Sequence, residues 1–171
     1  MDVRLLAEHD ADDFVRLRLE ALTREPRAFA REPAEALPWP PESVGARLRA
    51  VPEGNFAVGA FEGTRMIGQA GFYRHEGGKL CHKGTIWGVY VTAEARGRGA
   101  ARAMLTLMLS RLRDYRDLEQ VLIDVATSQA AARRLYVALG FELFGLEKHA
   151  LKVGDTYVDE EHRVLWLRKS P

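Results

Sequence analysis

The sequence predicts an α+β fold built around a mixed β-sheet. A strand-like segment over 3–7 and two helical segments open the chain, strands and helices alternate through its middle, and a pair of strands closes it. That order of elements is typical of an α+β protein. A length of 171 residues suits one compact domain, and no internal repeat or boundary interrupts it. We therefore expect a single domain spanning 1–171.

The first helix is expected over 10–23, because apolar residues recur on one face and Asp10 suits the N-cap. A proline-rich segment over 24–41 follows it and carries Phe29 and Trp39. Connections of that length inside a compact domain are usually functional or disordered. Two interpretations stay open for this segment: a lid over a substrate, or a packed loop.

A second short helix is expected over 42–50, beginning at Pro41 or Ser43. Alternating apolar and polar residues then predict two strands, over 55–61 and 66–73, with a turn between them. These two strands are expected to form a hairpin.

A strand over 83–91 is rich in β-branched and aromatic residues, and Gly88 interrupts its alternation. An isolated glycine in a strand indicates a bulge or a close approach of backbone. The clearest helix of the chain follows over 99–115, with an apolar face that consists of Ala103, Leu105, Leu107, Met108, Leu109 and Leu112. The remaining expected elements are a strand over 121–126, a helix over 129–139 that Gly140 ends, and paired strands over 142–151 and 156–167.

Composition argues against several classes of function. The formal net charge is +1, so no global positive field favours nucleic acid. No apolar run approaches the roughly 20 residues of a membrane span, and no signal peptide opens the chain. The single cysteine, Cys81, excludes an internal disulfide and has no Cys-His-Asn signature around it. We expect a soluble, cytoplasmic protein without nucleic-acid, membrane or metal partners.

The most informative segment is Arg96-Gly97-Arg98-Gly99-Ala100-Ala101, which follows a strand and opens the long helix. A helix N-terminus offers unpaired N–H groups and the positive end of the helix dipole, and both attract phosphate. Glycine and alanine let the backbone approach an anion closely, while the two arginines add charge. The segment lacks the Lys-Ser/Thr pair of a P-loop and the last glycine of a dinucleotide fingerprint. We expect it to bind a diphosphate.

Arg96, Gly99 and Ala101 meet the pattern Arg/Gln-x-x-Gly-x-Gly/Ala, and the segment 128–141 is similar to Asn-x-x-Ala-x-x-Leu-Tyr-x-x-x-Gly-Phe. On these motifs the chain resembles the GNAT superfamily of acetyl-CoA-dependent N-acetyltransferases, from about residue 55 onward. The resemblance implies a GNAT-like acyl-CoA N-acyltransferase fold, with a mixed, mostly antiparallel sheet of about seven strands flanked by about four helices.

The same resemblance implies roles for individual residues. Tyr136 matches the tyrosine that acts as general acid toward the leaving thiolate, and Gln129 stands where the family usually has asparagine. The strand at Gly88 would bulge and splay from its neighbour, leaving backbone groups free for the pantetheine arm. The residues implied to bind acetyl-CoA are Val89, Tyr90, Val91, Arg96, Gly97, Arg98, Gly99, Ala100, Ala101, Arg102 and Gln129.

The general base stays open at this stage. Candidates are His82, Asp124, Glu160 and Glu161, but a surface polar residue on a strand is the more common interpretation of each, and a chain of water molecules is a further alternative. The aromatic residues Trp87, Tyr90 and Tyr157 either line an acceptor pocket or belong to the core.

The predicted function is transfer of an acetyl group from acetyl-CoA to a primary amine, of a small molecule or a protein, by direct attack of the amine. Such a transfer needs positioning, a base, polarisation of the carbonyl oxygen and an acid, but no covalent intermediate. The alternatives are an acyltransferase that uses another acyl-CoA and a non-catalytic acyl-CoA sensor. The family also suggests a homodimer.

Overall fold

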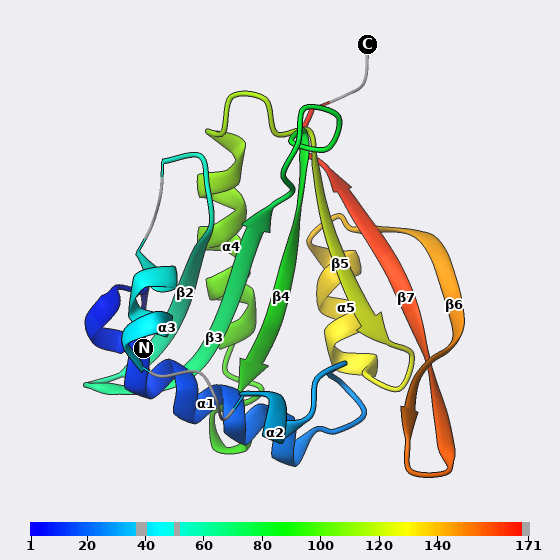
Figure 1. Ribbon diagram of the computed structural model, residues 1–171, viewed down its shortest axis with the longest axis horizontal. Coiled ribbons are helices and arrows are strands. Elements are labelled where there is room, and N and C mark those ends of the chain that lie inside the picture. The colour runs from blue at the N-terminus through cyan, green and yellow to red at the C-terminus, as the bar shows by residue number, and fades with distance from the viewer. Residues whose placement is uncertain (37–40, 50–51, 169–171) are drawn as a thin grey trace.

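The computed structural model describes residues 1–36, 41–49 and 52–168 and contains one seven-stranded sheet in the order β1-β2-β3-β4-β5-β7-β6 (Figure 1). Only β4 and β5 pair in parallel. The expected mixed, mostly antiparallel sheet is confirmed. The strands are β1 Asp2–Leu5, β2 Phe56–Glu62, β3 Arg65–Arg74, β4 Lys83–Val91, β5 Gln120–Ala126, β6 Glu142–Val153 and β7 Thr156–Trp166.

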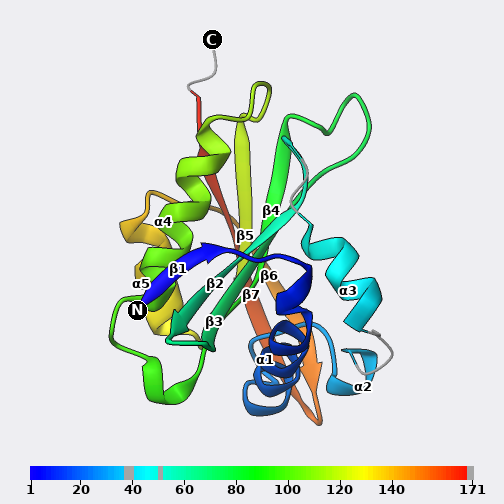
Figure 2. The same ribbon diagram turned by 90° about the vertical axis from the view of Figure 1, so that its left-hand side faces the viewer.

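Helices cover both faces of this sheet (Figure 2). Helices α4 and α5 lie on one face, and α1, α2 and α3 lie on the other, while the β6–β7 hairpin extends beyond the helices (Figures 1 and 2). The α-helices are α1 Ala11–Arg24, α2 Pro33–Ala36, α3 Pro41–Leu48, α4 Ala100–Arg113 and α5 Ala130–Ala138, and 3₁₀ turns span Glu8–Asp10 and Ala93–Ala95.

Among the described residues, the short helix α2 is the one α-helix that was not expected. It begins at Pro33, and proline is favoured at the first position of a helix because it has no N–H to lose there. Within the same connection, Phe29 packs against the apolar cluster beneath α1. Trp39 and the predicted end of the second helix at Ala50 lie outside the described residues.

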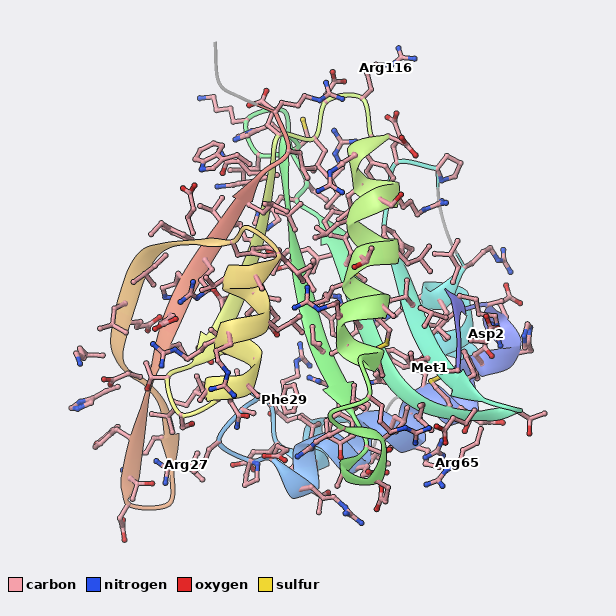
Figure 3. All side chains as sticks on the ribbon, turned by 180° about the vertical axis from the view of Figure 1, so that it is seen from behind. Met1, Asp2, Arg27, Phe29, Arg65 and Arg116 are labelled. Atoms are coloured by element: carbon pink, nitrogen blue, oxygen red, sulfur yellow. The ribbon has the colours of Figure 1, made fainter. Side chains whose placement is uncertain are left out.

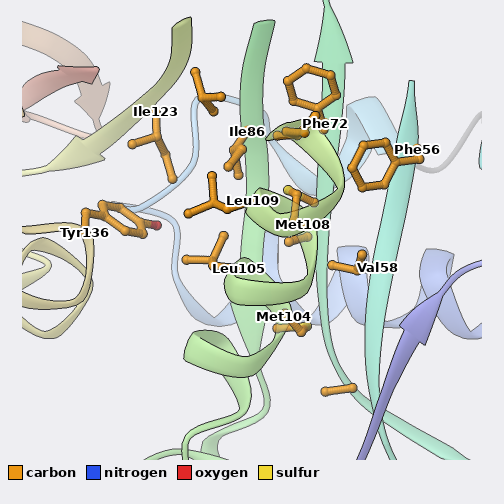
Figure 4. Packing of buried hydrophobic residues seen from close by; sticks show 14 of the residues in the cluster. Phe56, Val58, Phe72, Ile86, Met104, Leu105, Met108, Leu109, Ile123 and Tyr136 are labelled. Carbon is orange, nitrogen blue, oxygen red and sulfur yellow. The ribbon is translucent and has the colours of Figure 1, made fainter. Parts of the chain in front are cut away.

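The main core lies between the sheet and α4 (Figure 4). The buried stripe of α4 consists of Met104, Leu105, Met108, Leu109 and Leu112, which follow the helical period. Ala103 and Leu107 had also been expected on the apolar face, but they flank the stripe and are only half-buried.

The second core lies under α1, where the predicted apolar face of that helix is buried against β3 and β4. Asp10 occupies the N-cap position of α1, but its side chain makes no capping hydrogen bond. Its backbone has φ −89° and ψ 1°, not the extended conformation of a capping residue. Its carboxylate instead pairs with Arg4 at 2.7 Å and accepts the Ala7 N–H at 2.8 Å. Among the residues described, no helix is both long and apolar enough to cross a membrane.

Candidate active site

A bulge and a divergence of strands open a cleft beside β4. The register between β3 and β4 shifts between Gln69 and Gly71, opposite Gly88, which has φ +64°. On its other edge, β4 pairs with β5 only from Lys83 to Ile86. Beyond Ile86 the two parallel strands separate, so that edge of β4 has no strand partner from Trp87 onward. Both the bulge and the splay agree with the expectation from the sequence.

The resulting cleft has a volume of about 440 Å³. Its walls come from β4, β5, α5, the start of α4 and the loop after α1, including Phe29, which Figure 3 shows on that loop below the gap between β4 and α5. Arg98 is the one predicted site residue that does not line it. The predicted site residues that do are Val89, Tyr90, Val91, Arg96, Gly97, Gly99, Ala100, Ala101, Arg102, Gln129 and Tyr136.

The start of α4 supplies the anion-binding geometry. Gly97 and Gly99 adopt left-handed conformations, with φ +75° and +86°, which side-chain-bearing residues rarely adopt. The chain can therefore turn sharply from β4 into the helix. No hydrogen-bond partner among the described residues is recorded for the N–H groups of Ala100, Ala101 and Arg102, the first turn of α4. These N–H groups and the helix dipole form a site suited to phosphate.

The two arginines of this turn are already engaged. Arg96 pairs with Glu25 at 2.9 Å, and its Nε donates to the Val91 carbonyl at 3.0 Å. Its guanidinium also lies over the ring of Tyr90. Arg98 pairs with Glu62 and does not face the cleft. An anion at this helix start would therefore meet backbone N–H groups more than free arginine side chains.

Tyr136 brings a buried phenol to the opposite wall. Its side chain is 5% exposed, and Figure 4 shows the hydroxyl end directed from α5 toward α4. Burial raises the pKa of this phenol above its usual value, so the hydroxyl stays protonated at neutral pH.

The end of α5 holds Tyr136 in place. Gly140 has φ +93° and its N–H donates to Val137, while the Phe141 N–H donates to the Tyr136 carbonyl, which is the Schellman pattern. The rings of Phe141 and Tyr136 lie 6.0 Å apart. The Gly-Phe pair thus both ends the helix and supports the tyrosine.

Of the four candidate bases, only Asp124 lines the cleft. His82 precedes β4 at the end of that strand remote from the bulge. The carboxylate of Glu161 is occupied by Arg133 and Arg163, and its pKa is lowered, mainly by the hydrogen bond from Arg133. Glu160 does not reach the cleft.

Asp124 has a partner that the sequence did not reveal. His162 of β7 lies directly opposite it in the β5–β7 register, and its Nδ1 is 2.7 Å from the Asp124 Oδ1. The second ring nitrogen, Nε2, is 3.1 Å from Glu147. The hydrogen bond with Asp124 is the largest of the effects that raise the pKa of His162.

The three aromatic residues suggested for an acceptor pocket, Trp87, Tyr90 and Tyr157, lie in two different places. Trp87 and Tyr90 line the cleft, and Trp87 packs edge-on against Phe14 of α1, which places it on the α1 face of the sheet. Tyr90 donates its hydroxyl to Glu20 at 2.9 Å. Tyr157 does not line this cleft; it is half-exposed and stacked on His149.

A family model described as the acetyltransferase (GNAT) family matches residues 16–141 of the chain. Over 116 residues the chain is 31% identical to the N-alpha-acetyltransferase RimI of Mycobacterium tuberculosis, an alignment that covers 68% of this chain and 69% of that protein.

Solved structures share the fold. YncA from Salmonella typhimurium, whose structure contains acetyl-CoA, is 18% identical with a TM-score of 0.83, covering 100% of this chain and 96% of that chain. An acetyltransferase of the GNAT family from Streptococcus pneumoniae is 15% identical with a TM-score of 0.85, covering 96% of this chain and 98% of that chain. At such low sequence identities, these high TM-scores show a shared fold.

Proposed function

The chain belongs to the acetyltransferase (GNAT) family, and from that premise we propose that acetyl-CoA and a primary amine meet in the cleft between β4 and β5. As a member of that family, the protein transfers an acetyl group from acetyl-CoA to an amine. The amine belongs to a small molecule or to a protein. One observation carries the location: the splayed edge of β4, the first turn of α4 and Tyr136 all line a single cleft.

The N–H groups of Ala100 to Arg102 would hold the pyrophosphate of acetyl-CoA, because they have no partner among the described residues and lie at the positive end of a 14-residue helix. The free edge of β4 at Val89 and Val91 would bind the pantetheine amides as a neighbouring strand would. Gln129, beside the start of α5, lines the same cleft and can hydrogen-bond to this arm.

Asp124 and Tyr136 would then handle the protons. An ammonium group must lose a proton before its nitrogen can attack the thioester carbonyl, and the Asp124 carboxylate is the base candidate in the cleft. Collapse of the tetrahedral intermediate breaks the carbon–sulfur bond and expels a thiolate. The Tyr136 hydroxyl, which burial keeps protonated, donates to that sulfur.

The anion site is tested by Ala101→Glu, which puts a carboxylate into the first turn of α4. A carboxylate there interacts favourably with the helix dipole, but Ala101 is half-buried against the core, so the melting temperature of the variant is measured alongside to separate lost binding from lost folding. We expect acetyl-CoA affinity, measured by calorimetry, to fall at least about tenfold through repulsion and obstruction. Thr106→Glu, at an exposed position further along α4, is the control and should bind normally. Unchanged affinity of Ala101→Glu would contradict this location.

Turnover is measured as thiol release from acetyl-CoA across amino acids, polyamines, aminoglycosides and peptides. A protein that binds acetyl-CoA but transfers to none of them would favour the sensor alternative. Thiol release that occurs only when a longer acyl-CoA replaces acetyl-CoA would favour a different acyl donor. A homodimer, a cytoplasmic location, a single domain and the absence of a metal stay predictions from the sequence.

A further inference from the structure

Arg18, on α1, is a buried cation without a counterion among the described residues. Its side chain is 7% exposed, and its Nε and Nη1 atoms are fully buried with no hydrogen-bond partner. Throughout the part of the chain that the structure describes, no carboxylate forms an ion pair with it. Arg16, two residues before it on a more exposed face of the helix, pairs with Asp13 at 2.7 Å. A buried charge without a partner is costly, and native proteins rarely keep one without a reason.

The guanidinium of Arg18 is directed at the wall of the cleft. A Cβ atom built on Gly88 would lie 3.3 Å from its Nη1. The rings of Phe29 and Trp87 lie 5.1 and 5.8 Å from its Cζ. Gly88, Phe29 and Trp87 all line the cleft. Arg18 itself does not line the cleft; its unpartnered N–H groups lie immediately behind the α1 side of the proposed active site, so a ligand would reach them by displacing Phe29 or Trp87.

The two rings compensate Arg18 only in part. They attract the cation, but they offer no lone pair to its N–H groups. Desolvation lowers the pKa of Arg18 to about 10, and the positive charge of Arg31 contributes to the same shift. At neutral pH the side chain still carries its charge, so this end of the cleft favours an anion. The planar fork of a guanidinium matches a carboxylate, which can accept two parallel hydrogen bonds.

We propose that Arg18 binds a carboxylate of the acceptor, so that the acceptor is an amine that also carries a carboxylate: an amino acid. This inference rests on the proposed function. Asp124 lines the cleft from β5, and Trp87 and Gly88 of β4 lie between it and α1. An amino acid lying across β4 would direct its nitrogen toward Asp124 and its carboxylate toward Arg18. A peptide N-terminus lacks that neighbouring carboxylate, and a polyamine would meet a like charge.

The test compares matched acceptors with acetyl-CoA as donor: α-, β- and γ-amino acids, each beside its amide. In at least one pair, we expect kcat/KM for the acid to exceed kcat/KM for its amide by about tenfold or more. Arg18→Met should lower kcat/KM for that acid by about ten- to a hundredfold, mainly through KM, because a hydrogen-bonded charge pair is lost. The amide should be unaffected, and Arg18→Lys should recover part of the loss. Arg16→Met is the matched control on the same helix and should retain the preference.

A binding measurement separates recognition from folding and from catalysis. With CoA present, N-acetylated amino acids should raise the melting temperature of the wild type more than their amides do, and Arg18→Met should abolish that difference. The variant alone should melt at or above the wild-type temperature, because an apolar side chain replaces an unpaired buried charge. A large fall in melting temperature would identify Arg18 as structural and overturn the proposal.

The carboxylate could instead belong to the acyl group of the donor. Succinyl-CoA with a simple amine distinguishes this source: a loss on Arg18→Met confined to succinyl-CoA would overturn the assignment to the acceptor. Equal turnover and binding of acids and amides would also overturn it while leaving acetyl transfer intact. Failure to bind acetyl-CoA at all would instead contradict the proposed function itself.

Discussion

The hydroxyl of Tyr136 is suited to donate a hydrogen bond at the moment a thiolate appears. Its pKa is raised by burial, so it does not ionise beforehand at neutral pH. A thiol has an ordinary pKa of about 8.5, below that of a phenol at about 10. Complete transfer from the phenol is therefore uphill. A strong hydrogen bond to the developing thiolate, followed by reprotonation from solvent, fits these values better than an early transfer.

Tyr136→Phe removes this hydroxyl while keeping the ring that packs against Phe141. We expect kcat to fall roughly a hundredfold or more, the magnitude typical of a lost general acid. Acetyl-CoA affinity and melting temperature should stay close to wild type, because the cavity is not enlarged. Thiol-release kinetics together with calorimetry measure both quantities. Unchanged kcat would rule out the proposed role.

The pairing of His162 with Asp124 predicts a pH-dependent stability. The pKa of His162 is raised, first by its hydrogen bond to Asp124, with Glu147 adding to the effect. A raised folded-state pKa means that the pair stabilises the fold fully below about pH 6.5, the ordinary value. That stabilisation is lost as the pH rises through the folded-state value. Glu160, two residues before His162 on β7, is another titratable carboxyl group on the same strand.

His162→Gln tests the predicted loss of stabilisation with rising pH. Urea unfolding should show the variant less stable than wild type by up to about 1 kcal/mol near pH 6, the scale of a partly exposed ion pair. Near pH 9 the difference should vanish, since the wild-type imidazole is neutral there. A difference in unfolding free energy that is equal at both pH values would show that His162 contributes packing alone.

At the scale of elements, the proposed function depends on one irregular strand. The bulge at Gly88 shifts β4 against β3, and the edge of β4 that faces β5 is left unpaired beyond Ile86. A regular strand would continue the parallel ladder and close the cleft. Gly88 is suited to this position because it adopts φ +64°, which costs other residues about 1–2 kcal/mol.

Gly88→Ala should therefore destabilise the protein by about 1–2 kcal/mol and weaken acetyl-CoA binding, because relieving the strain moves the edge of β4. Gly78→Ala is the matched control. Gly78 has a negative φ, and an added Cβ there meets nothing within 4 Å. Denaturant unfolding and calorimetry measure both effects, and equal behaviour of the two variants would contradict the strain argument.

The sequence predicted these elements well where the signal is local. Gly88, Gly140 and the glycines before α4 mark backbone conformations that few other residues adopt, so the bulge, the helix end and the sharp turn could each be expected. The apolar stripe of α4 was placed less accurately. The expected face included Ala103 and Leu107 and omitted the buried Met104, because small shifts in helical phase change which flanking residue is buried.

Long-range pairings could not be predicted in the same way. Asp124 meets His162 because β7 inserts between β5 and β6, and that strand order is invisible in a linear pattern. The free charge of Arg18 became visible only once its neighbours were known, since the sequence alone shows an arginine near the apolar face of an amphipathic helix. Arg98 was assigned to the cleft from its glycine neighbours, but it turns toward Glu62.

At the scale of the whole molecule, the separation of β4 from β5 opens a cleft that is lined from both faces of the sheet. The first turn of α4 and Tyr136 of α5 approach the cleft from one face, where Figure 2 shows both helices. Phe29 and Trp87 approach it from the face that α1 covers. Donor and acceptor would thus enter from opposite sides and meet where β4 and β5 separate. Such an arrangement allows direct transfer with both substrates bound together.

A donor bound along this cleft would join parts of the fold that otherwise have few contacts across the splay. Binding to the native state alone stabilises it by about 2.7 kcal/mol at a hundredfold excess over Kd. For a domain of this size, each 1 kcal/mol shifts the melting temperature by about 2–4 °C. We therefore expect acetyl-CoA at that excess to raise it by roughly 5–10 °C. Acetylated pantetheine, which lacks the pyrophosphate, should give a clearly smaller shift at the same concentration. Equal shifts would show that the first turn of α4 contributes no affinity, and they would remove the anion site from the proposed mechanism.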